Sequence, residues 1–483
     1  MLFAVLLSAC ATNPATGKHE ISLMSVEQEI AIGEQQDVQV RKEMGVYSDR
    51  TLQDYVSGIG MRLAADSDRP NLPWRFTVVD TPAVNAFALP GGYIYITRGI
   101  LPYLQDEAQL AGVLGHEIGH VTARHAAQQY SRSIGAELGL LAGAIFVPQT
   151  RPFTGLGESG VSVLMLKYSR DDEAQSDALG VKYAARAGWD PAGVPQMLTT
   201  LGRIEETSDN KGTPSWLQTH PLAADRVDRV QSAVAEAEQG ATSSRPGDSA
   251  PRSFITDRAG FTTRLDRLVY GDNPEQGVVR AGTFLHAGLR FAVEFPSTWD
   301  VTNGPTQVVA KAPDAAGTLM LLGEIDHPVG GDLEDIALRS MQNAGFRARS
   351  GGRTAINSLE AFVGTYDGTT KNLGRVVMRA AHVQLGRAVF LIAGVAPTAS
   401  FDTVEPHFTR TIDSFRPLTR GEAEAIHPNR IALYTARTGD TWQAIAERAG
   451  KGIVKPATLA IINGHAVSEQ PRAGERLKIV VSG

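Results

Sequence analysis

The stretch GVLGHEIGHVTARH at residues 112–125 constrains the fold of this chain more than any other feature. It places His116 and His120 four positions apart, with Glu117 directly after the first histidine. Because residues four apart share one face of a helix, both imidazoles can bind one metal ion. This His-Glu-x-x-His spacing is typical of zinc hydrolases, in which the glutamate acts as a general base. The apolar residues between these positions indicate a helix that is buried beside a metal site.

A catalytic zinc ion usually takes three protein ligands, so a third ligand has to come from elsewhere. The longer pattern His-Glu-x-x-His-x-x-Gly-x-x-His is excluded because positions 123 and 126 are both alanine. His125 would lie roughly 140° round the helix from His120. We therefore expect His125 to have a structural role.

Two acidic residues in the stretch YSRDDEAQSDALG at 168–180 offer a better source of the third ligand. Glu173 and Asp177 are again four positions apart, so they share one face of a predicted helix. We expect Glu173 to bind the metal and Asp177 to accept a hydrogen bond from the free ring N–H of a metal-binding histidine. Without the histidine motif, this pair would indicate only an exposed acidic helix face.

Composition sets the broad class of the chain. Its 483 residues are 42% hydrophobic, which is ordinary for globular proteins. At roughly 150 residues per domain, this length predicts about three domains. The net charge of −6 gives no reason to expect nucleic acid as a partner.

The order of patterns along the chain predicts a multidomain protein. We expect a short apolar segment (1–10), a mainly α domain with a small β-sheet that carries the metal motif (11–238), a Gly/Ser/Pro-rich linker (239–252), an α+β domain of unknown role (253–418) and a small βααβ module (432–483). The resemblances to known families imply that the first is a lipoprotein signal remnant and the second a zincin metallopeptidase domain. Within the second segment, the apolar stretch 134–147 is too short to span a bilayer. It could form a lid over the active site or a core helix.

Several motifs together resemble a known family. HEIGH followed by Tyr-Ser-Arg-x-x-Glu-x-x-x-Asp is similar to the zinc metallopeptidases of the CAAX-prenyl endopeptidase and HtpX family, and within it to the BepA-like and LoiP-like branch of periplasmic lipoproteins. The stretches NAFALPGGYIYITRGIL and THPLAADRV extend the resemblance, which covers about residues 11–238. It implies a zincin fold, one Zn²⁺ per chain and endopeptidase activity on polypeptides. The helical repeat domain of BepA-like members is replaced here, so the resemblance implies nothing about partners.

Two further residues are candidates for the site. His220 precedes Pro221 in a predicted loop. It could stabilise the oxyanion, or it could occupy the open zinc position, which is the latch that the matching histidine of BepA-like relatives suggests. Arg226 could hold the substrate or pair with acidic residues near the site.

The stretch GGYIYIT alternates like a β-strand next to the metal motif. An extended substrate could pair with such a strand through backbone hydrogen bonds. We therefore assign Gly92, Tyr93 and Ile94 to substrate binding, together with Arg226.

The chain opens MLFAVLLSAC, which resembles the lipobox of bacterial lipoprotein signals. The resemblance implies a lipid anchor at Cys10 and a periplasmic location. Ala11 directly after the cysteine points to the outer membrane.

The last fifty residues, from TARTGDTWQAIAERAG to RLKIVV, resemble a LysM module. This resemblance implies peptidoglycan as a partner of residues 432–483. A βααβ module that only packs against or spaces other parts of the protein is the alternative.

These observations favour a zinc-dependent endopeptidase that hydrolyses misfolded or misassembled envelope proteins, with Glu117 and His220 as catalytic residues. The alternative is a chaperone-like or cell-wall-binding scaffold with a latched, mostly silent zinc site. An intact Glu117 favours the enzyme because a structural zinc site needs no general base. A peptidoglycan hydrolase is a third hypothesis, which the similarity of the metal motif to a protein-cleaving family disfavours.

Overall fold

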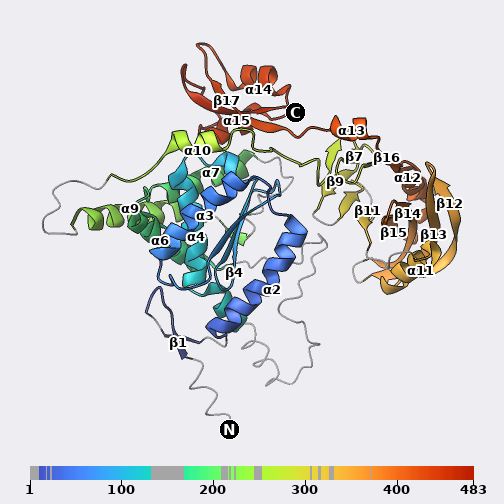
Figure 1. The fold of residues 1–483 in the computed structure, drawn as a ribbon, viewed down its shortest axis with the longest axis horizontal. Helices are drawn as coiled ribbons and strands as arrows, with labels where there is room; N and C mark the ends of the chain where they lie inside the picture. The colour runs from blue at the N-terminus through green and yellow to red at the C-terminus, as the bar shows by residue number, and fades with distance from the viewer. Residues whose placement is uncertain are drawn as a thin grey trace, which may run out of the picture. The chain divides into compact units, whose positions relative to one another are not determined.

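The chain folds into two compact units (Figure 1). The computed structural model describes residues 10–17, 19–21, 24–131, 168–207, 216, 219–221, 225–243, 253–304, 307–313, 317–325, 331–370 and 373–483. Among these residues, unit 1 comprises those up to 271 together with 429–482, and unit 2 comprises 272–428 with Gly483. The predicted lid or core helix at 134–147 lies outside the described residues.

Unit 1 contains a three-stranded sheet of order β3-β5-β4, formed by β3 (Arg75–Val79), β5 (Tyr93–Thr97) and β4 (Ala86–Leu89). β3 runs parallel to β5, and β4 runs antiparallel to it. The turn between β4 and β5 is the predicted Pro-Gly-Gly, in which Gly91 and Gly92 have φ angles of 82° and 102° that favour glycine. β4 is consequently an edge strand and β5 the buried middle strand.

Helices surround this sheet and make up most of unit 1. They are α2 (Val26–Met44), α3 (Arg50–Ala65), η1 (Leu101–Tyr103), α4 (Glu107–Thr122), α6 (Arg170–Ala187), α7 (Gly193–Thr207), α9 (Arg226–Ser243) and α10 (Arg258–Arg264), with a small β1 (Cys10–Thr12) and β2 (His19–Ile21) hairpin at the start. The predicted boundaries shift here: α9 extends into the expected linker 239–252, and residues 253–271 belong to unit 1 rather than to the α+β domain.

Helix α4 is the centre of unit 1, and every residue from Ala108 to Thr122 is buried. Its N-terminus is capped by Asp106, whose side chain accepts a hydrogen bond from the Gln109 amide. Two glycines of the motif let α6 approach closely. A Cβ at Gly119 would lie 2.9 Å from the Ser176 carbonyl oxygen, and one at Gly115 would lie 3.2 Å from the Gly180 carbonyl oxygen. This close packing brings the acidic face of α6 against the histidines of α4.

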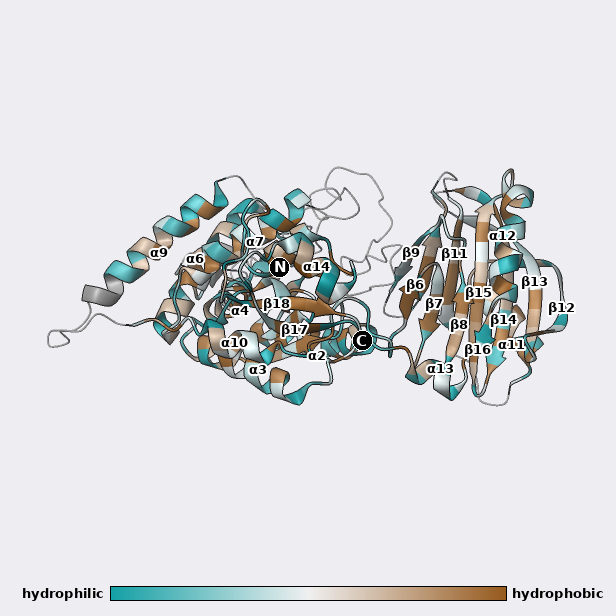
Figure 2. Ribbon diagram, turned by 90° about the horizontal axis from the view of Figure 1, so that it is seen from above, coloured by the Kyte–Doolittle hydropathy of each residue, from teal (hydrophilic) through white to brown (hydrophobic). Residues whose placement is uncertain are grey.

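Unit 2 has the α+β composition that the sequence predicts. A seven-stranded sheet has the order β12 (Arg347–Ile356), β13 (Leu359–Thr370), β14 (Gly374–Leu385), β15 (Ala388–Pro397), β11 (Leu319–Glu324), β10 (Val308–Lys311) and β9 (Asp300–Asn303). A four-stranded sheet has the order β16 (Arg416–Pro417), β8 (Phe291–Glu294), β7 (Thr283–His286) and β6 (Val278–Arg280), and the helices are α11 (Leu333–Asn343), α12 (Phe401–Asp413) and α13 (Arg420–Glu424). Strand β15 is predominantly apolar, as Figure 2 shows, and it helps to form the core of this unit.

The C-terminal residues form β17 (Arg430–Thr435), α14 (Trp442–Gly450), α15 (Pro456–Ile462) and β18 (Arg476–Val481), which is the predicted strand–helix–helix–strand order. We call residues 429–482 the C-terminal module. It is not a separate domain, because its residues Ile431, Ile462 and Val480 join the hydrophobic core of unit 1. The Lys478 ammonium is buried and donates hydrogen bonds to the carbonyl oxygens of Pro102 (2.7 Å) and Leu104 (2.5 Å), just before α4.

No helix among the described residues is long and apolar enough to cross a membrane.

Candidate metal centre

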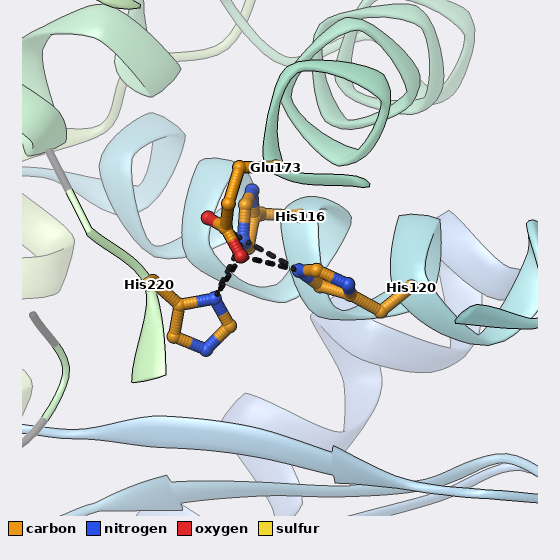
Figure 3. A group of neighbouring side chains, drawn as sticks. All are labelled: His116, His120, Glu173 and His220. Atoms are coloured by element: carbon orange, nitrogen blue, oxygen red, sulfur yellow. Dashed lines mark hydrogen bonds and ion pairs between the residues drawn. The ribbon is translucent and has the colours of Figure 1, made fainter. Parts of the chain in front are cut away.

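Three histidines and one glutamate converge at the contact between α4 and α6 (Figure 3). His116 and His120 project from α4, and their Nε2 atoms lie 3.0 Å apart. The Glu173 carboxylate of α6 lies 3.6 Å from His116 Nε2 and 3.5 Å from His120 Nε2. His220 completes the group, with its Nδ1 atom 2.9 Å from Glu173 Oε1 and 3.3 Å from His116 Nε2. The structure therefore brings together the predicted ligands and His220.

This donor set fits zinc. All four residues are buried, and one ligand atom from each lies within 4.8 Å of the others. Ligands at about 2.1 Å from a tetrahedral zinc ion would be separated by roughly 3.4 Å, which is close to the separations found here. Imidazole nitrogens and a carboxylate oxygen are also the ligands that zinc prefers. His116, His120 and Glu173 would hold the ion, and His220 is positioned as a potential fourth ligand.

Asp177 lies one helical turn after Glu173 and contacts the other nitrogen of His116. Its Oδ1 atom is 2.9 Å from His116 Nδ1, as expected for a carboxylate that orients a metal-binding imidazole. Burial alone would raise the pKa of Asp177, but hydrogen bonds from Arg226 and His116 lower it to about 2. Asp177 is thus ionised and leaves His116 Nε2 directed at the cluster of ligand atoms.

Arg226 is buried against this acidic pair rather than exposed to a substrate. Its side chain is 2% exposed, and it donates hydrogen bonds to Asp177 Oδ2 (2.6 Å) and Oδ1 (2.9 Å). Its Nη2 atom also lies 2.9 Å from Glu173 Oε2. Of its two predicted roles, the structure shows the pairing with acidic residues near the site, and substrate binding stays a prediction.

Glu117 is a buried carboxylate whose Oε1 atom lies 3.6 Å from His220 Nε2. Burial raises its pKa, against the opposing effect of nearby His220 and His116. A buried carboxylate outside the ligand set is costly for a fold to retain, which marks it as a candidate functional group. It is therefore available to exchange a proton beside the ligand cluster.

His220 is held in place by aromatic stacking. The Trp216 ring is stacked on it at a centroid distance of 4.6 Å, and the His220 amide donates to the Trp216 carbonyl oxygen. Burial would lower the pKa of His220, but the charges of Glu173 and Glu117 outweigh it and raise the pKa. A histidine in this position can act as a metal ligand or as a hydrogen-bond donor within the site.

The contact of His125 with the metal-site residue His120 was not predicted from the sequence. Helix α4 ends at Thr122, and Arg124 adopts a φ of 59°, which returns the chain so that His125 Nδ1 lies 2.9 Å from His120 Nδ1. His125 Nε2 in turn lies 2.8 Å from Gln175 Oε1. His120 Nε2 faces the ligand cluster, so the proton of the His120 ring lies on Nδ1. This Nδ1–H donates to His125 Nδ1, and the Nε2–H of His125 donates to Gln175 Oε1.

Tyr168 was also missed as a contact of the site. Its ring is stacked on His120 at a centroid distance of 3.9 Å. Burial raises its pKa well above the usual value, so its hydroxyl stays protonated. The adjacency of Tyr168 to the Ser-Arg-x-x-Glu motif was the only signal in the sequence.

The predicted substrate strand is corrected by the sheet order. Tyr93 and Ile94 lie on β5, which pairs with β3 on one side and with β4 on the other. The carbonyl oxygen of Gly92 already accepts from the Arg75 amide. The prediction that these three residues pair with a substrate through their backbone is therefore wrong, because β4 is the strand with a free edge.

The site defines a class of protein: a zinc-dependent hydrolase in which one helix supplies two histidines and a general base, and a second helix supplies a carboxylate ligand. Comparison with known families agrees with this class. Residues 50–234 match Peptidase family M48, so this part of the chain is similar to M48 peptidases.

Parts of several known proteases are similar to this chain. The chain is 31% identical over 222 residues to the putative beta-barrel assembly-enhancing protease of Vibrio cholerae, covering 44% of this chain and 46% of the relative. It is 30% identical over 226 residues to the beta-barrel assembly-enhancing protease of Escherichia coli, covering 45% and 46%. It is 32% identical over 191 residues to the mitochondrial metalloendopeptidase OMA1 of Arabidopsis thaliana, covering 39% and 38%. The chain therefore spans less than half the length of these relatives.

Proposed function

We propose that unit 1 is a zinc-dependent endopeptidase that hydrolyses peptide bonds of misfolded or misassembled proteins of the bacterial cell envelope. The observation that carries the proposal is Glu117, a buried carboxylate that lies beside a zinc-ligand set without belonging to it. The M48 match and the names of the relatives support this activity. The envelope as the location of the substrates is supported by the names of the assembly-enhancing proteases alone.

Each side chain of the site has a defined role in this proposal. Zinc, when bound, supplies Lewis acidity for the hydrolysis of a peptide carbonyl. Glu117 accepts the proton of the attacking water and passes it to the leaving amine. Burial raises its pKa, which favours the protonated form that Glu117 takes between the two transfers. Asp177 and His125 contact the Nδ1 atoms of His116 and His120, which fixes the orientation of both rings.

The edge strand β4 is the place where an extended substrate would pair by backbone hydrogen bonds. A small hollow joins this strand to the site, lined by Ala88, Leu89 and Pro90 on one side and by His120 and Tyr168 on the other. Recognition through the backbone requires an extended segment and few particular side chains. This would suit a peptidase that removes unfolded chains of varied sequence.

A latched scaffold is the second candidate function, and His220 is the observation that favours it. Its Nδ1 atom lies within the same 4.8 Å cluster as the three ligands. A fourth protein ligand would leave no position for water, as in structural zinc sites. In an enzyme, His220 would have to move away or donate a hydrogen bond to the oxyanion.

We further propose a lipid anchor at Cys10, an outer-membrane location on the periplasmic side, and binding of peptidoglycan through residues 432–483. The sequence MLFAVLLSAC supports the anchor, and the strand–helix–helix–strand order supports a LysM-like module. Labelling with a palmitate analogue, compared between the natural protein and Cys10→Ser, tests the anchor.

Zinc content and casein cleavage of Glu117→Gln test the proposed activity. We expect this variant to keep about one zinc per chain and to lose cleavage, because Glu117 does not belong to the ligand set. Glu206→Gln, on the exposed side of α7, is the matched control and should cleave normally. Equal activity of Glu117→Gln and Glu206→Gln would refute the general base.

His220→Ala separates the two roles of His220. Faster cleavage would establish the latch, and slower cleavage with unchanged zinc would establish oxyanion stabilisation.

A further inference from the structure

We propose that unit 1 binds a carboxylate-bearing oligosaccharide in a cavity between the peptidase domain and the C-terminal module. The cavity has a volume of about 750 Å³. One wall is α7 with the start of α4 and α10, and the other wall is the loop between α15 and β18. Its lining residues include Asp106, Gln196, Thr199, Thr200, Arg203 and Arg258 on the first wall, and Gly464, His465, Glu469, Arg472, Ala473 and Glu475 on the second.

The two walls are fixed relative to one another by buried polar contacts. Gln105 Nε2 donates to the Ile462 carbonyl oxygen at 3.1 Å, and Arg203 Nη1 donates to the Gly464 carbonyl oxygen at 2.9 Å. The buried Lys478 ammonium adds the two hydrogen bonds to the residues before α4. The cavity is therefore a preformed feature of one compact unit, as small-ligand sites usually are.

Three guanidinium groups make the cavity rich in hydrogen-bond donors. Arg472 shows no side-chain hydrogen bond or ion pair to any described residue, and Arg203 uses only Nη1 in the contact with Gly464. Arg258 Nη2 is 3.8 Å from Glu475 Oε1, an oxygen that also lies 2.8 Å from His465 Nε2. Planar guanidinium groups with free donors bind carboxylates in a bidentate manner. A ligand that carries a carboxylate fits this arrangement.

The rest of the lining favours a ligand whose carboxylates are separated by neutral polar groups. Asp106, Glu469 and Glu475 would repel closely spaced negative charges, such as those of a chain of phosphates. The hydroxyls of Thr199 and Thr200 donate to the carbonyls of their own helix and keep lone pairs for a donor from the ligand. Ala473 supplies the only apolar side chain of the lining, so apolar peptide side chains or lipid would leave the many polar groups of the lining without hydrogen-bond partners. Sugar hydroxyls both donate and accept hydrogen bonds, so they can pair with the arginine donors and with the threonine and carboxylate acceptors of the lining.

This inference rests on the proposal that the protein binds glycan, and it places that glycan on both the peptidase domain and the module. It needs no peptidase activity. Because α7 lies within the residues that match Peptidase family M48, the peptidase domain itself supplies half of the glycan site.

Isothermal titration of the full chain tests the proposal with four probes. Two carry carboxylates on sugars: a peptide-free tetrasaccharide of alternating N-acetylglucosamine and N-acetylmuramic acid, and tetragalacturonate. Chitotetraose is the neutral sugar control, and tetraglutamate is the carboxylate control without sugar. We expect one or both carboxylated sugars to bind, and their ratio of affinities identifies cell-wall glycan or uronate polymer as the source. Equal binding of chitotetraose or of tetraglutamate would overturn the proposed ligand class.

Variants on both walls locate the site. Arg472→Ala and Arg203→Ala should each weaken binding roughly tenfold, because each removes a charge-assisted hydrogen bond to the carboxylate. Arg437→Ala, an exposed arginine of the module outside the cavity, is the matched control. Hydrogen exchange of β18 amides in Arg203→Ala shows that the module stays docked. If the glycan binds but all three variants bind it equally, the cavity is not the binding site, although the protein does bind glycan. If no probe binds, both glycan binding and its location in the cavity are refuted.

Discussion

Replacing Arg226 by methionine tests whether this residue is the counter-ion of the metal-site carboxylates or a substrate contact. The side chain is 2% exposed and makes its two shortest hydrogen bonds to Asp177, at 2.6 and 2.9 Å. It also lies 2.9 Å from Glu173. Methionine keeps much of the apolar stem but leaves two adjacent buried carboxylates without their cation. Removing one partner of a buried ion pair costs about 3–5 kcal/mol, and we expect the metal-free protein to lose this amount.

Bound zinc should reduce the free energy of unfolding that is lost when Arg226 is replaced by methionine. A bound zinc ion places two positive charges beside Glu173, so it replaces part of the charge that Arg226 supplies. Native-state hydrogen exchange of amides in α6 and α9 measures the free energy of opening, first in a chelator and then with zinc. We expect the loss to be larger in the chelator.

Arg229→Met is the matched control for this experiment. Arg229 lies one turn further along α9, 47% of its side chain is exposed, and it pairs with Asp225 at 3.3 Å. Such a surface pair contributes at most about 0.5 kcal/mol. Equal stability of the two variants would refute the counter-ion role, and a higher KM at unchanged stability would return Arg226 to substrate binding.

Three further predictions concern other parts of the molecule. His125→Phe should weaken zinc binding about 10- to 100-fold in a chelator competition, because His120 Nδ1 loses its acceptor; unchanged affinity would contradict the relay through His125. Ending the chain after residue 428 should increase hydrogen exchange at the start of α4, because the hydrogen bonds of Lys478 to the residues before this helix are lost. Unchanged exchange there would show that the C-terminal module does not stabilise α4. Acid should destabilise unit 2 through His382, a buried histidine with neither ring nitrogen hydrogen-bonded, whose pKa burial lowers from 6.5 to about 4. Because its folded pKa lies below its unfolded pKa, the unfolded chain binds more protons between these values, and stability falls as pH falls through them. The natural protein should lose about 3 kcal/mol more than His382→Phe between pH 7 and pH 4, measured by hydrogen exchange in β14; equal losses would refute the assignment.

The ligand set could be predicted because it depends on helical spacing within two short segments. His116 and His120 share a helix face by geometry, as do Glu173 and Asp177, and the structure places all four as expected. The glycines at positions 115 and 119 then determine how closely the two helices pack. Helical periodicity within these two segments was therefore sufficient to predict which residues form the ligand set.

The remaining errors come from features that periodicity does not encode. His125 reaches His120 only because the helix ends at Thr122 and Arg124 has a left-handed backbone conformation. The pattern of β5 predicts a strand but does not show that both of its edges are paired. Lys478 stands in the run RLKIVV, which looks like a half-exposed strand, yet its ammonium is buried against backbone carbonyls. Such tertiary contacts depend on segments more than 300 positions apart in the chain.

The way the chain leaves and re-enters unit 1 has a consequence for its biogenesis. Residues 267–270 pair with residues 429–431, so the chain departs to form unit 2 and returns to the same place. The strand that carries Lys478 therefore emerges after the whole of unit 2, whether from the ribosome or from a translocation channel, although it packs against the residues leading into the metal-site helix. Folding of unit 1 can finish only after this strand has emerged. A nascent chain that has not reached this point carries its histidines and glutamates without the complete scaffold that holds them.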